Sequence, residues 1–522
     1  MEKFDVIIIG GGPSGYAAAM RAIDLDKKVC LIEKNKIGGA AIYNGALSSK
    51  TLWEIANKVN DINQFSKFDR SETNTTSTRN KAHQIILPNF NKWLSNNVPY
   101  KMEWNDVQNA LNEAINERSA QLTQQIDFLV SPNNNAKFTF KKGTAHFVSA
   151  NEVCIESEDT NTTIYGENIV IATGSRPNVP STIKVDEQFI FTSDGIEHIS
   201  EYPKSIVIVG GGVIGCEYAT IFANFGQTKV HIIDRQERIL PFEDEDISLL
   251  VSESLESKGV TIHHEASLVR MEVIDNEVEY ELSYPDQPNC ILRVEKALLS
   301  VGRVPNHENL HLENAGVKLS KRGVHIGDND TQTNVPSIYT VGDVSGKITL
   351  VNMGEIEGRY AIEKAYGLNT NTLNYDNICT IMFLNPEVAC IGLNEQNCIE
   401  KNIPVKIVKI DYSLIARAIA MRKTKGFFKI IVSNDHEMKI LGMRAVGMHA
   451  STAIQAVGLL IKMNEGIDAL SELVHPHPSI VEGIQECVRV LLNKSIFKST
   501  ILNDKLQCYS LVNGVKTPLE RL

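Results

Sequence analysis

The segment FDVIIIGGGPSG, residues 4–15, joins a buried-strand pattern to a glycine-rich turn. Its first six residues are mostly apolar and β-branched, as in a buried parallel strand. Gly10, Gly12 and Gly15 follow in G-x-G-x-x-G spacing, before a helical pattern and a second strand, KVCLIE, that ends at Glu33. The glycines let a pyrophosphate approach the helix N-terminus, and Glu33 can accept hydrogen bonds from a ribose. This order predicts a dinucleotide-binding unit rather than a glycine turn without a ligand.

The same order recurs in SIVIVGGGVIGCEYATIFANFGQTKVHIID, residues 205–234. Strand, glycine turn, helix, strand and terminal acid appear again, and this doubled unit is the one internal repeat in the sequence. Two nucleotide sites in one chain are expected where a flavin and a nicotinamide exchange hydride. The second turn is formed by Gly210, Gly212 and Gly215.

The terminal acid of the second unit, Asp234, bears on the choice of nicotinamide. A carboxylate there suits the 2′-hydroxyl of NAD and repels the 2′-phosphate of NADP. Arg235 and Arg238 follow closely, and either could reach a phosphate. We expect NAD, with NADP as the alternative.

Length and composition exclude several other classes of protein. The 522 residues exceed one hydrophobic core and indicate about three domains. A formal net charge of −11 argues against binding to nucleic acid or an anionic membrane, which require a basic surface. No apolar run reaches the roughly 20 residues of a membrane span, and the N-terminus lacks a secretion signal, so we expect a cytoplasmic protein. The nine cysteines have no metal-binding spacing, so we expect no metal site and mostly buried thiols.

Three further segments complete a known pattern. NIVIATGSRP and ALLSVGRVPN each lead from a strand into a glycine turn, at Gly174 and Gly302, and TNVPSIYTVGDVSG places Asp343 after a strand. With the two nucleotide units, they make the chain resemble the pyridine nucleotide–disulfide oxidoreductases, the flavoenzyme family of dihydrolipoyl dehydrogenase and glutathione reductase. The resemblance covers residues 4–58 and 120–498.

The resemblance implies an α/β fold with two Rossmann-type domains, for FAD and NAD(P), and a C-terminal α+β dimerisation domain in a homodimer. The expected ranges are 1–178 and 301–372 for the two parts of the FAD-binding domain, 179–300 for the NAD(P)-binding domain, and 373–522 for the dimerisation domain with a C-terminal extension. By resemblance, FAD is bound by Gly10, Gly12, Gly15, Glu33, Gly174 and Asp343, and NAD by Gly210, Gly212, Gly215, Asp234 and Gly302.

In the dimerisation segment, GFFKIIV and KILGMRAVG alternate like antiparallel strands, and SNDHE between them predicts a turn. AIQAVGLLIKMNEG predicts an amphipathic helix ended by Gly466. Beyond the family pattern, Asn513 and Gly514 lie between apolar stretches and predict a hairpin.

Residues 60–105 form an insert longer than the family usually has. Residues 71–81 within it are polar without a hydrophobic period, which predicts an exposed or disordered loop. Residues 105–126 predict a helix. Its apolar face consists of Val107, Leu111, Ile115, Leu122 and Ile126.

In the family, the segment after the first nucleotide unit carries two redox cysteines. Here the matching positions in GGAAIYNGALSSK are Ala41 and Ala46. Alanine offers no thiolate, and dithiol exchange requires one. Tyr43, Asn44 and Ser48, where the family has proline, also depart from the motif, which indicates natural divergence rather than engineered removal of two sulfurs.

Other catalytic residues of the family have counterparts. By resemblance, Lys50 lies near flavin N5 and Glu217 pairs with it, with an ordinary buried ion pair as the alternative. His477 and Glu482 match the general-base dyad that reaches the flavin from the other subunit. Ser479 and Glu482 also fit a capping box, so Glu482 could serve only to start the next helix.

These features predict an FAD-dependent NAD(P)H oxidoreductase that passes hydride from NADH through flavin to a small-molecule acceptor other than a dithiol. A quinone, a second nicotinamide and dioxygen are the expected acceptors. Two alternatives remain open. One is a catalytically silent flavoprotein subunit or sensor. The other is a true dihydrolipoyl dehydrogenase that uses a distant thiol, with Cys487 or Cys508 as the candidate.

Overall fold

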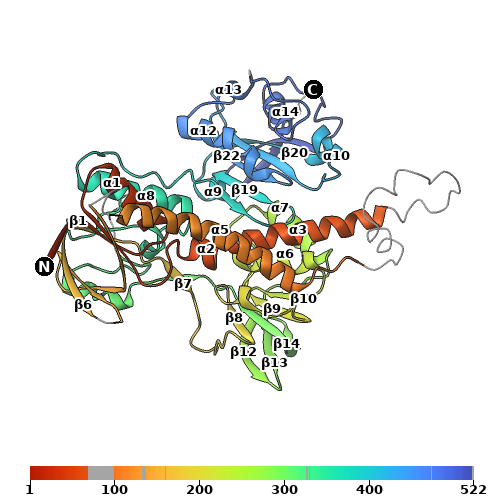
Figure 1. Ribbon diagram of the computed structural model, residues 1–522. Helices are drawn as coiled ribbons and strands as arrows, with labels where there is room; N and C mark the ends of the chain where they lie inside the picture. The colour runs from red at the N-terminus through yellow and green to blue at the C-terminus, as the bar shows by residue number, and fades with distance from the viewer. Residues whose placement is uncertain are drawn as a thin grey trace, which may run out of the picture.

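The chain forms two nucleotide-type sheets and a C-terminal sheet, with two long helices running between them (Figure 1). In Figure 1 the first sheet lies at the left, the second at the lower centre and the third at the top. The predicted loop at residues 71–81 lies outside the described residues. The computed structural model describes residues 1–68, 99–131, 137–158, 160–324, 327, 330–471 and 473–519.

The first sheet has the order β3-β2-β1-β6-β5-β4, with β17 beside β6. Both faces are covered, so alternate residues of its central strand enter two different cores. Val6 and Ile8 pack with alanines of α1 (Pro13–Asp24), whereas Ile7 and Ile9 pack on the opposite face. The strands are β1 (Glu2–Ile9), β2 (Val29–Glu33), β3 (Phe138–Lys142), β4 (Thr144–Phe147), β5 (Glu152–Glu156), β6 (Asn161–Ile171) and β17 (Ile338–Thr340). The helix α8 (Val351–Ala365) packs against α1.

The second sheet is parallel throughout, in the order β11-β10-β9-β15-β8. The helix α6 (Val213–Phe225) connects β9 to β10, as the second nucleotide unit predicts, and α7 (Glu245–Glu256) follows. An antiparallel meander of three strands packs beside it. The strands are β8 (Ile190–Thr192), β9 (Ser205–Val209), β10 (Lys229–Ile233), β11 (Thr261–His263), β12 (Ser267–Ile274), β13 (Glu277–Tyr284), β14 (Gln287–Val294) and β15 (Lys296–Leu299).

The two strand-to-glycine turns are parts of one antiparallel ribbon, formed by β7 (Ser175–Pro177) and β16 (Arg303–Pro305). The backbone carbonyl of Gly174 accepts from Asn306 and that of Gly302 accepts from Asn178, each at 2.9 Å. The sequence predicts both turns but not their pairing, because the two segments lie far apart in the chain.

The two long helices are α3 (Ala46–Phe68) and α5 (Trp104–Val130), which pack against each other. The predicted apolar face of α5 is confirmed, since Val107, Leu111, Leu122 and Ile126 are buried and Ile115 is partly buried. The Tyr43 hydroxyl lies 2.7 Å from Oγ of Ser119, so α5 also contacts α2 (Ala40–Tyr43).

The C-terminal sheet is antiparallel and has the order β18-β19-β22-β21-β20-β23-β24. The turn predicted at SNDHE joins β21 to β22, and the hairpin predicted at Asn513 and Gly514 joins β23 to β24. Both hairpin residues have positive φ, 50° and 77°, as a two-residue turn requires. The strands are β18 (Thr380–Met382), β19 (Val388–Gly392), β20 (Val405–Asp411), β21 (Phe427–Ser433), β22 (Ile440–Val446), β23 (Leu506–Val512) and β24 (Val515–Pro518).

The helix predicted to end at Gly466 ends earlier. It is α12 (Gln455–Met463), and Asn464 terminates it in the left-handed region with φ of 58°. Gly466 instead forms a bridge with Lys439, where a Cβ would lie 2.5 Å from the carbonyl oxygen of Glu437. The domain's other helices are α9 (Glu395–Glu400), α10 (Ala416–Ala420), α11 (Ala450–Ala453), α13 (Asp468–Ser471) and α14 (Glu482–Leu491).

Candidate functional site

The first glycine turn has the shape that a pyrophosphate requires. Gly10 has φ of +109°, and a Cβ there would lie 2.3 Å from the carbonyl oxygen of Ala172. A Cβ on Gly15 would lie 1.9 Å from the carbonyl oxygen of Gly10, so α1 approaches the sheet closely only with glycine at both positions. At Gly12, the N-cap of α1, a Cβ would meet no protein atom within 4 Å. The turn therefore fits a phosphate group at the helix N-terminus.

Glu33 ends β2 and faces the same turn. Its Oε2 accepts a hydrogen bond from the backbone N–H of Gly11, and its Oε1 accepts one from that of Asn35, both at 2.7 Å. These two bonds orient the carboxylate beside the glycine turn, where a ribose hydroxyl can also donate to it.

The second unit repeats this geometry. A Cβ on Gly215 would lie 2.0 Å from the carbonyl oxygen of Gly210, and a Cβ on Gly212 would meet no protein atom within 4 Å. Oδ2 of Asp234 accepts from the backbone N–H of Gly211 at 2.6 Å, as Glu33 does from Gly11. Both turns therefore fit the same chemical group.

Of the two arginines after Asp234, only Arg235 is exposed and free to approach a phosphate. The expectation for Arg238 is wrong, because acceptors of its own domain hold its guanidinium. It donates to the carbonyl oxygens of Glu243 and Pro241 and to the Ser248 hydroxyl at 2.7–3.0 Å.

Asp343 lies in a 3-10 turn, η5 (Gly342–Ser345), beside the ribbon of β7 and β16. Its Oδ2 accepts from the Ser175 hydroxyl at 2.6 Å. Arg303 donates to that hydroxyl oxygen and to the carboxylate of Asp194, each at 2.9 Å. The ribbon therefore orients Asp343 from both of its strands.

Ala41 and Ala46 flank the tight turn between α2 and α3. Ala41 is half-buried and Ala46, the first residue of α3, is exposed. The Ser48 hydroxyl is fully buried and accepts from the backbone N–H of Gly45 at 2.9 Å. Ser48 therefore holds the turn that lies between the two alanines.

Lys50 and Glu217 form the ion pair that the resemblance implies, with 2.9 Å between Nζ and Oε2. Oε1 of Glu217 accepts from the backbone N–H of Phe383 at 3.0 Å, and the Lys50 ammonium lies 4.9 Å from the centre of the Phe383 ring. The side chain of Glu217 is 8% exposed and that of Lys50 is 29% exposed. The positive charge of Lys50 is therefore held in place by groups on α3, α6 and the end of β18. The sequence analysis missed the contribution of Phe383.

A second buried carboxyl group, missed by the sequence analysis, lies near this pair. Glu197 in η2 (Ile196–His198) is 1% exposed, and its Oε1 accepts from the Tyr218 hydroxyl at 2.8 Å. Burial raises its pKa to about 7, although the hydroxyls of Ser48 and Tyr218 and the charge of Lys50 lower it. A single glutamate in IEHIS carries no periodic signal of burial, so the sequence could not reveal it.

His477 and Glu482 are in contact, with 2.8 Å between Nδ1 and Oε1. Oε2 of Glu482 accepts from the backbone N–H of Ser479 at 2.8 Å, which is half of the predicted capping box. The other half is wrong: the Ser479 hydroxyl has no hydrogen-bond partner in the described part of the chain, and α14 begins at Glu482 itself. In the single chain the His477 side chain is 74% exposed.

Two family models match the chain. The pyridine nucleotide-disulphide oxidoreductase model matches residues 4–358, and the model of the dimerisation domain of these enzymes matches residues 378–488. The chain belongs to the pyridine nucleotide-disulphide oxidoreductase family. The α/β fold with a C-terminal dimerisation domain is thereby confirmed, and this domain supports a homodimer.

Similar members of the family are dihydrolipoyl dehydrogenases. Those of Bacillus subtilis and Chlamydia pneumoniae are each 31% identical over 481 residues, covering 92% of this chain and 97% and 95% of their own lengths. Among solved structures, the HOCl-induced flavoprotein disulfide reductase RclA from Escherichia coli has a TM-score of 0.78 at 24% identity, covering 93% of this chain and 100% of its own. LpdA from Mycobacterium tuberculosis has a TM-score of 0.80 at 21% identity, covering 94% and 100%. These two structures share the fold.

As a member of this family, the chain is an FAD-dependent pyridine nucleotide oxidoreductase of the dihydrolipoyl dehydrogenase-like type. The glycine turns fit the pyrophosphates of FAD and NAD(P)H. In the described ranges, no group of three or more histidine, cysteine or acidic residues is suited to hold a metal ion. None of the helices in those ranges combines the length and apolar character of a membrane span.

The cysteines of this chain are mostly buried. All nine cysteines are among the described residues and none forms a disulfide. Cys30 on β2 packs into the core of the first sheet, where burial raises its pKa to about 12. Cys487 is fully buried, which raises its pKa well above the usual range. Such thiols are poor nucleophiles.

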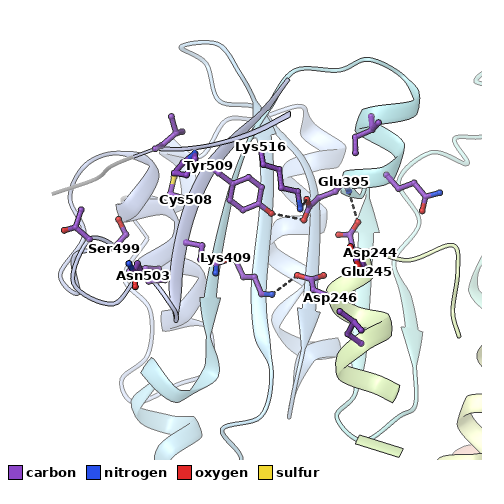
Figure 2. A pocket seen from close by; sticks show the side chains of 18 of the residues that line it. Asp244, Glu245, Asp246, Glu395, Lys409, Ser499, Asn503, Cys508, Tyr509 and Lys516 are labelled. Atoms are coloured by element: carbon purple, nitrogen blue, oxygen red, sulfur yellow. Dashed lines mark hydrogen bonds and ion pairs between the residues drawn. The ribbon is translucent and has the colours of Figure 1, made fainter. Parts of the chain in front are cut away.

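The structure also has a cleft of about 1380 Å³ between α7, α9 and the C-terminal hairpin (Figure 2). Lys516 and Tyr509 of the hairpin point toward Glu395 of α9, with contacts of 2.6 and 2.8 Å to its carboxylate oxygens. Of the residues that the sequence analysis singled out, Arg238 and Cys508 line it, whereas the two glycine turns, Lys50, Glu217 and His477 do not. Its central charges are paired with one another, as expected for a structural contact between domains.

Proposed function

We propose that the chain is an FAD-dependent NADH oxidoreductase that passes electrons to a small-molecule acceptor other than a dithiol. The observation that carries this proposal is the pair of alanines, Ala41 and Ala46, where the resemblance places the family's redox cysteines. The chain nevertheless keeps both nucleotide turns and the pair of Lys50 and Glu217. Alanine cannot attack a disulfide or change redox state, so no thiol relay is available at this segment.

FAD, when bound, supplies the two-electron transfer between the nicotinamide and the acceptor. The chain's own part is to bind and orient. The first glycine turn and Glu33 would hold the pyrophosphate and ribose, and Asp343, oriented by Ser175, would hold the ribityl chain. In the second domain, Asp234 would accept hydrogen bonds from the ribose hydroxyls of NAD, and its charge would disfavour NADP.

Lys50 has an electrostatic role in this proposal. Its ammonium group is fixed by Glu217 and lies over the Phe383 ring, so its positive charge stays in one place. A fixed cation stabilises negative charge that develops during electron transfer without the cost of reorganisation. Glu217 is then a positioning residue for Lys50.

A quinone, a second nicotinamide and dioxygen are the acceptors that we propose, because each takes electrons without a thiol. The small side chains of Ala41 and Ala46 leave room for such a molecule, and Ala46 is exposed. In a homodimer, His477 held by Glu482 would orient or protonate the acceptor from the partner subunit. We propose a cytoplasmic location and a role in redox homeostasis.

An anaerobic titration of the purified yellow holoprotein tests the proposal. NADH should bleach the flavin completely without a long-wavelength thiolate–flavin band, since no thiolate lies at position 41 or 46. Dihydrolipoamide should not reduce the flavin at a catalytic rate. A quinone, thio-NAD or oxygen should then restore the oxidised spectrum, followed by stopped flow.

Each contrary result of this titration has a distinct meaning. Stoichiometric reduction by dihydrolipoamide with a thiolate–flavin band would show that another cysteine has taken over the relay. Failure of every acceptor to reoxidise the reduced protein would identify a silent flavoprotein. A colourless protein that FAD cannot reconstitute would reject the central assignment.

A further inference from the structure

Glu197 is a buried acid in the region where the family places its redox disulfide. It is 1% exposed, and its Oε1 accepts from the Tyr218 hydroxyl. Its Oε2 has no partner in hydrogen-bonding geometry within the described ranges, although the Ser48 hydroxyl is near enough to lower the pKa of the group. A buried carboxyl oxygen without a donor favours the protonated form, which needs no compensating charge.

The charged groups around Glu197 do not fully offset the cost of ionising its buried carboxyl group. Asp194 lies close enough for its negative charge to raise the pKa, and Lys50 is the cation whose charge lowers it. Lys50 is already paired with Glu217 at 2.9 Å, so its charge is largely shared. Together with the Tyr218 hydroxyl, these groups leave the pKa at about 7, near the pH at which a group both gives and regains a proton.

Ser48 connects this acid to the turn that carries the lost redox positions. Its oxygen accepts from the backbone N–H of Gly45 at 2.9 Å, which leaves its own hydrogen free to donate. Ser48 is fully buried, so water does not compete for that hydrogen. The hydroxyl therefore lies between the carboxyl group of Glu197 and the turn of Gly45 and Ala46. In the family, proline at this position has no hydroxyl to serve such a contact.

We propose that Glu197 is the acid of this site, with His477 orienting the acceptor, and that its carboxyl group gives, through the Ser48 hydroxyl, the proton that a quinone takes up with two electrons. This inference rests on the proposed function. The overall reaction is NADH plus quinone plus one proton, which gives NAD⁺ and quinol. NADH supplies two electrons and one proton as hydride, and Glu197 supplies the second proton to the quinone oxygen. After the quinol leaves, a proton from solvent returns to the carboxylate through the same Ser48 hydroxyl.

A nicotinamide acceptor makes the proposal sharply testable, because hydride transfer from NADH to thio-NAD consumes no additional proton. In the holoenzyme, Glu197→Gln should lower quinone reduction by about 100-fold or more, the usual contribution of a general acid, and leave thio-NAD reduction within about twofold. Ser48→Ala should lower quinone reduction in the same selective way. Glu256→Gln, an exposed change on α7, is the matched control and should alter neither rate.

A measurement without turnover checks the acid itself. Infrared spectra of the holoprotein, recorded without NADH, should show a protonated carboxyl C=O band that disappears as the pH rises through about 7, and Glu197→Gln should remove it. Glu357 is the second carboxyl whose pKa burial raises to about 7, so Glu357→Gln is the comparison and should remove a different band. Loss of the same band in both variants, or of none, overturns the inference.

The two proposals fail differently. Reduction by dihydrolipoamide with a thiolate–flavin band would reject the proposed function and this inference with it. Suppose that NADH–quinone turnover occurs, and that Glu197→Gln lowers both quinone and thio-NAD reduction to the same extent or lowers neither of them. The proposed function then stands, and Glu197 is only a structural residue. Selective loss of quinone reduction supports both.

Discussion

Buried carboxyl groups in this chain differ in how far neighbouring groups offset the rise in pKa that burial causes. Burial alone would raise the pKa of Asp246, but the charges of Lys429 and Lys409 in direct contact lower it below the usual value. Glu197 is more deeply buried and has hydroxyl neighbours and only a shared ammonium, so burial raises its pKa to about 7. Two cations in direct contact therefore outweigh burial at Asp246, whereas one shared ammonium group does not outweigh it at Glu197.

Glu197 should make the folding stability depend on pH. Its pKa is about 7 in the folded chain, against 4.5 as the reference, so the folded state binds more protons between these values. The contribution of Glu197 to the free energy of unfolding is then fully present below about pH 4.5 and is lost as the pH rises through about 7. At 1.36 kcal/mol per pKa unit the loss is roughly 3 kcal/mol.

Thermal unfolding of the wild type and Glu197→Gln from pH 5 to 8 measures this effect. The wild type should lose stability relative to the variant across that range. Glu357 has a similar shift, but it is present in both proteins and its contribution cancels. A constant difference in Tm across the range would contradict the expected titration.

Asp234 should set the preference for NADH. Replacing it with alanine removes the carboxylate that would accept from the ribose hydroxyls, at a cost of roughly 1.5–3 kcal/mol, or about 10–100-fold in kcat/KM for NADH. NADPH should lose less, because the repulsion of its 2′-phosphate is removed as well. The ratio of kcat/KM values for the two nucleotides is the measurement. Asp234→Asn is the control, since it retains an acceptor for the N–H of Gly211.

Among the elements, the C-terminal hairpin has an evident structural role. Strand β23 pairs with β20, which extends the dimerisation sheet, and Figure 2 shows the hairpin facing α7 and α9 across the cleft. Lys429 of β21 is fully buried beside these elements. Its Nζ contacts Glu395, Asp246 and Asp244 at 2.6, 2.8 and 3.1 Å. One ammonium group thus joins α7 of the second nucleotide domain to the C-terminal sheet.

Replacing Lys429 with methionine should destabilise the protein strongly. The volume is nearly conserved, but Asp244 and Glu395 are left buried without their shared cation, which costs about 3–5 kcal/mol. Urea unfolding should show a lower midpoint. Lys516→Met is the matched control. The Lys516 side chain, which pairs with Glu395, is 57% exposed, so removing its charge should lower the free energy of unfolding by at most about 1 kcal/mol. Equal losses would contradict the central role of Lys429.

The whole molecule should be a homodimer in solution, as the dimerisation domain supports. Light scattering should give twice the chain mass of 57.9 kDa at micromolar concentration. Exposed apolar side chains of this domain include Leu459 and Met463 on α12 and Val474, which is 91% exposed in the single chain and close in sequence to His477. We expect the partner subunit to cover Val474.

Val474→Asp should therefore shift the equilibrium toward monomer and lower NADH oxidation together, because His477 would no longer reach the partner's site. His477→Ala is the companion variant, which should keep the dimer and affect only the reaction. A wild-type monomer at micromolar concentration would reject any role of His477 across the interface.

Local features of the chain were predictable, because backbone sterics and the spacing of apolar residues determine them. They include the strand–turn–helix units, the hairpin at Asn513 and the apolar face of α5. The pairing of Lys50 with Glu217 followed from the family resemblance alone. Other features depended on contacts between residues far apart in the chain. The ribbon of β7 and β16, the capture of Arg238 by carbonyl groups and the burial of Glu197 belong here. Whether a charged side chain is free, paired or buried depends on which distant elements pack around it. No local pattern records that packing, so tertiary structure alone decided which acids of this chain are paired and which can hold a proton.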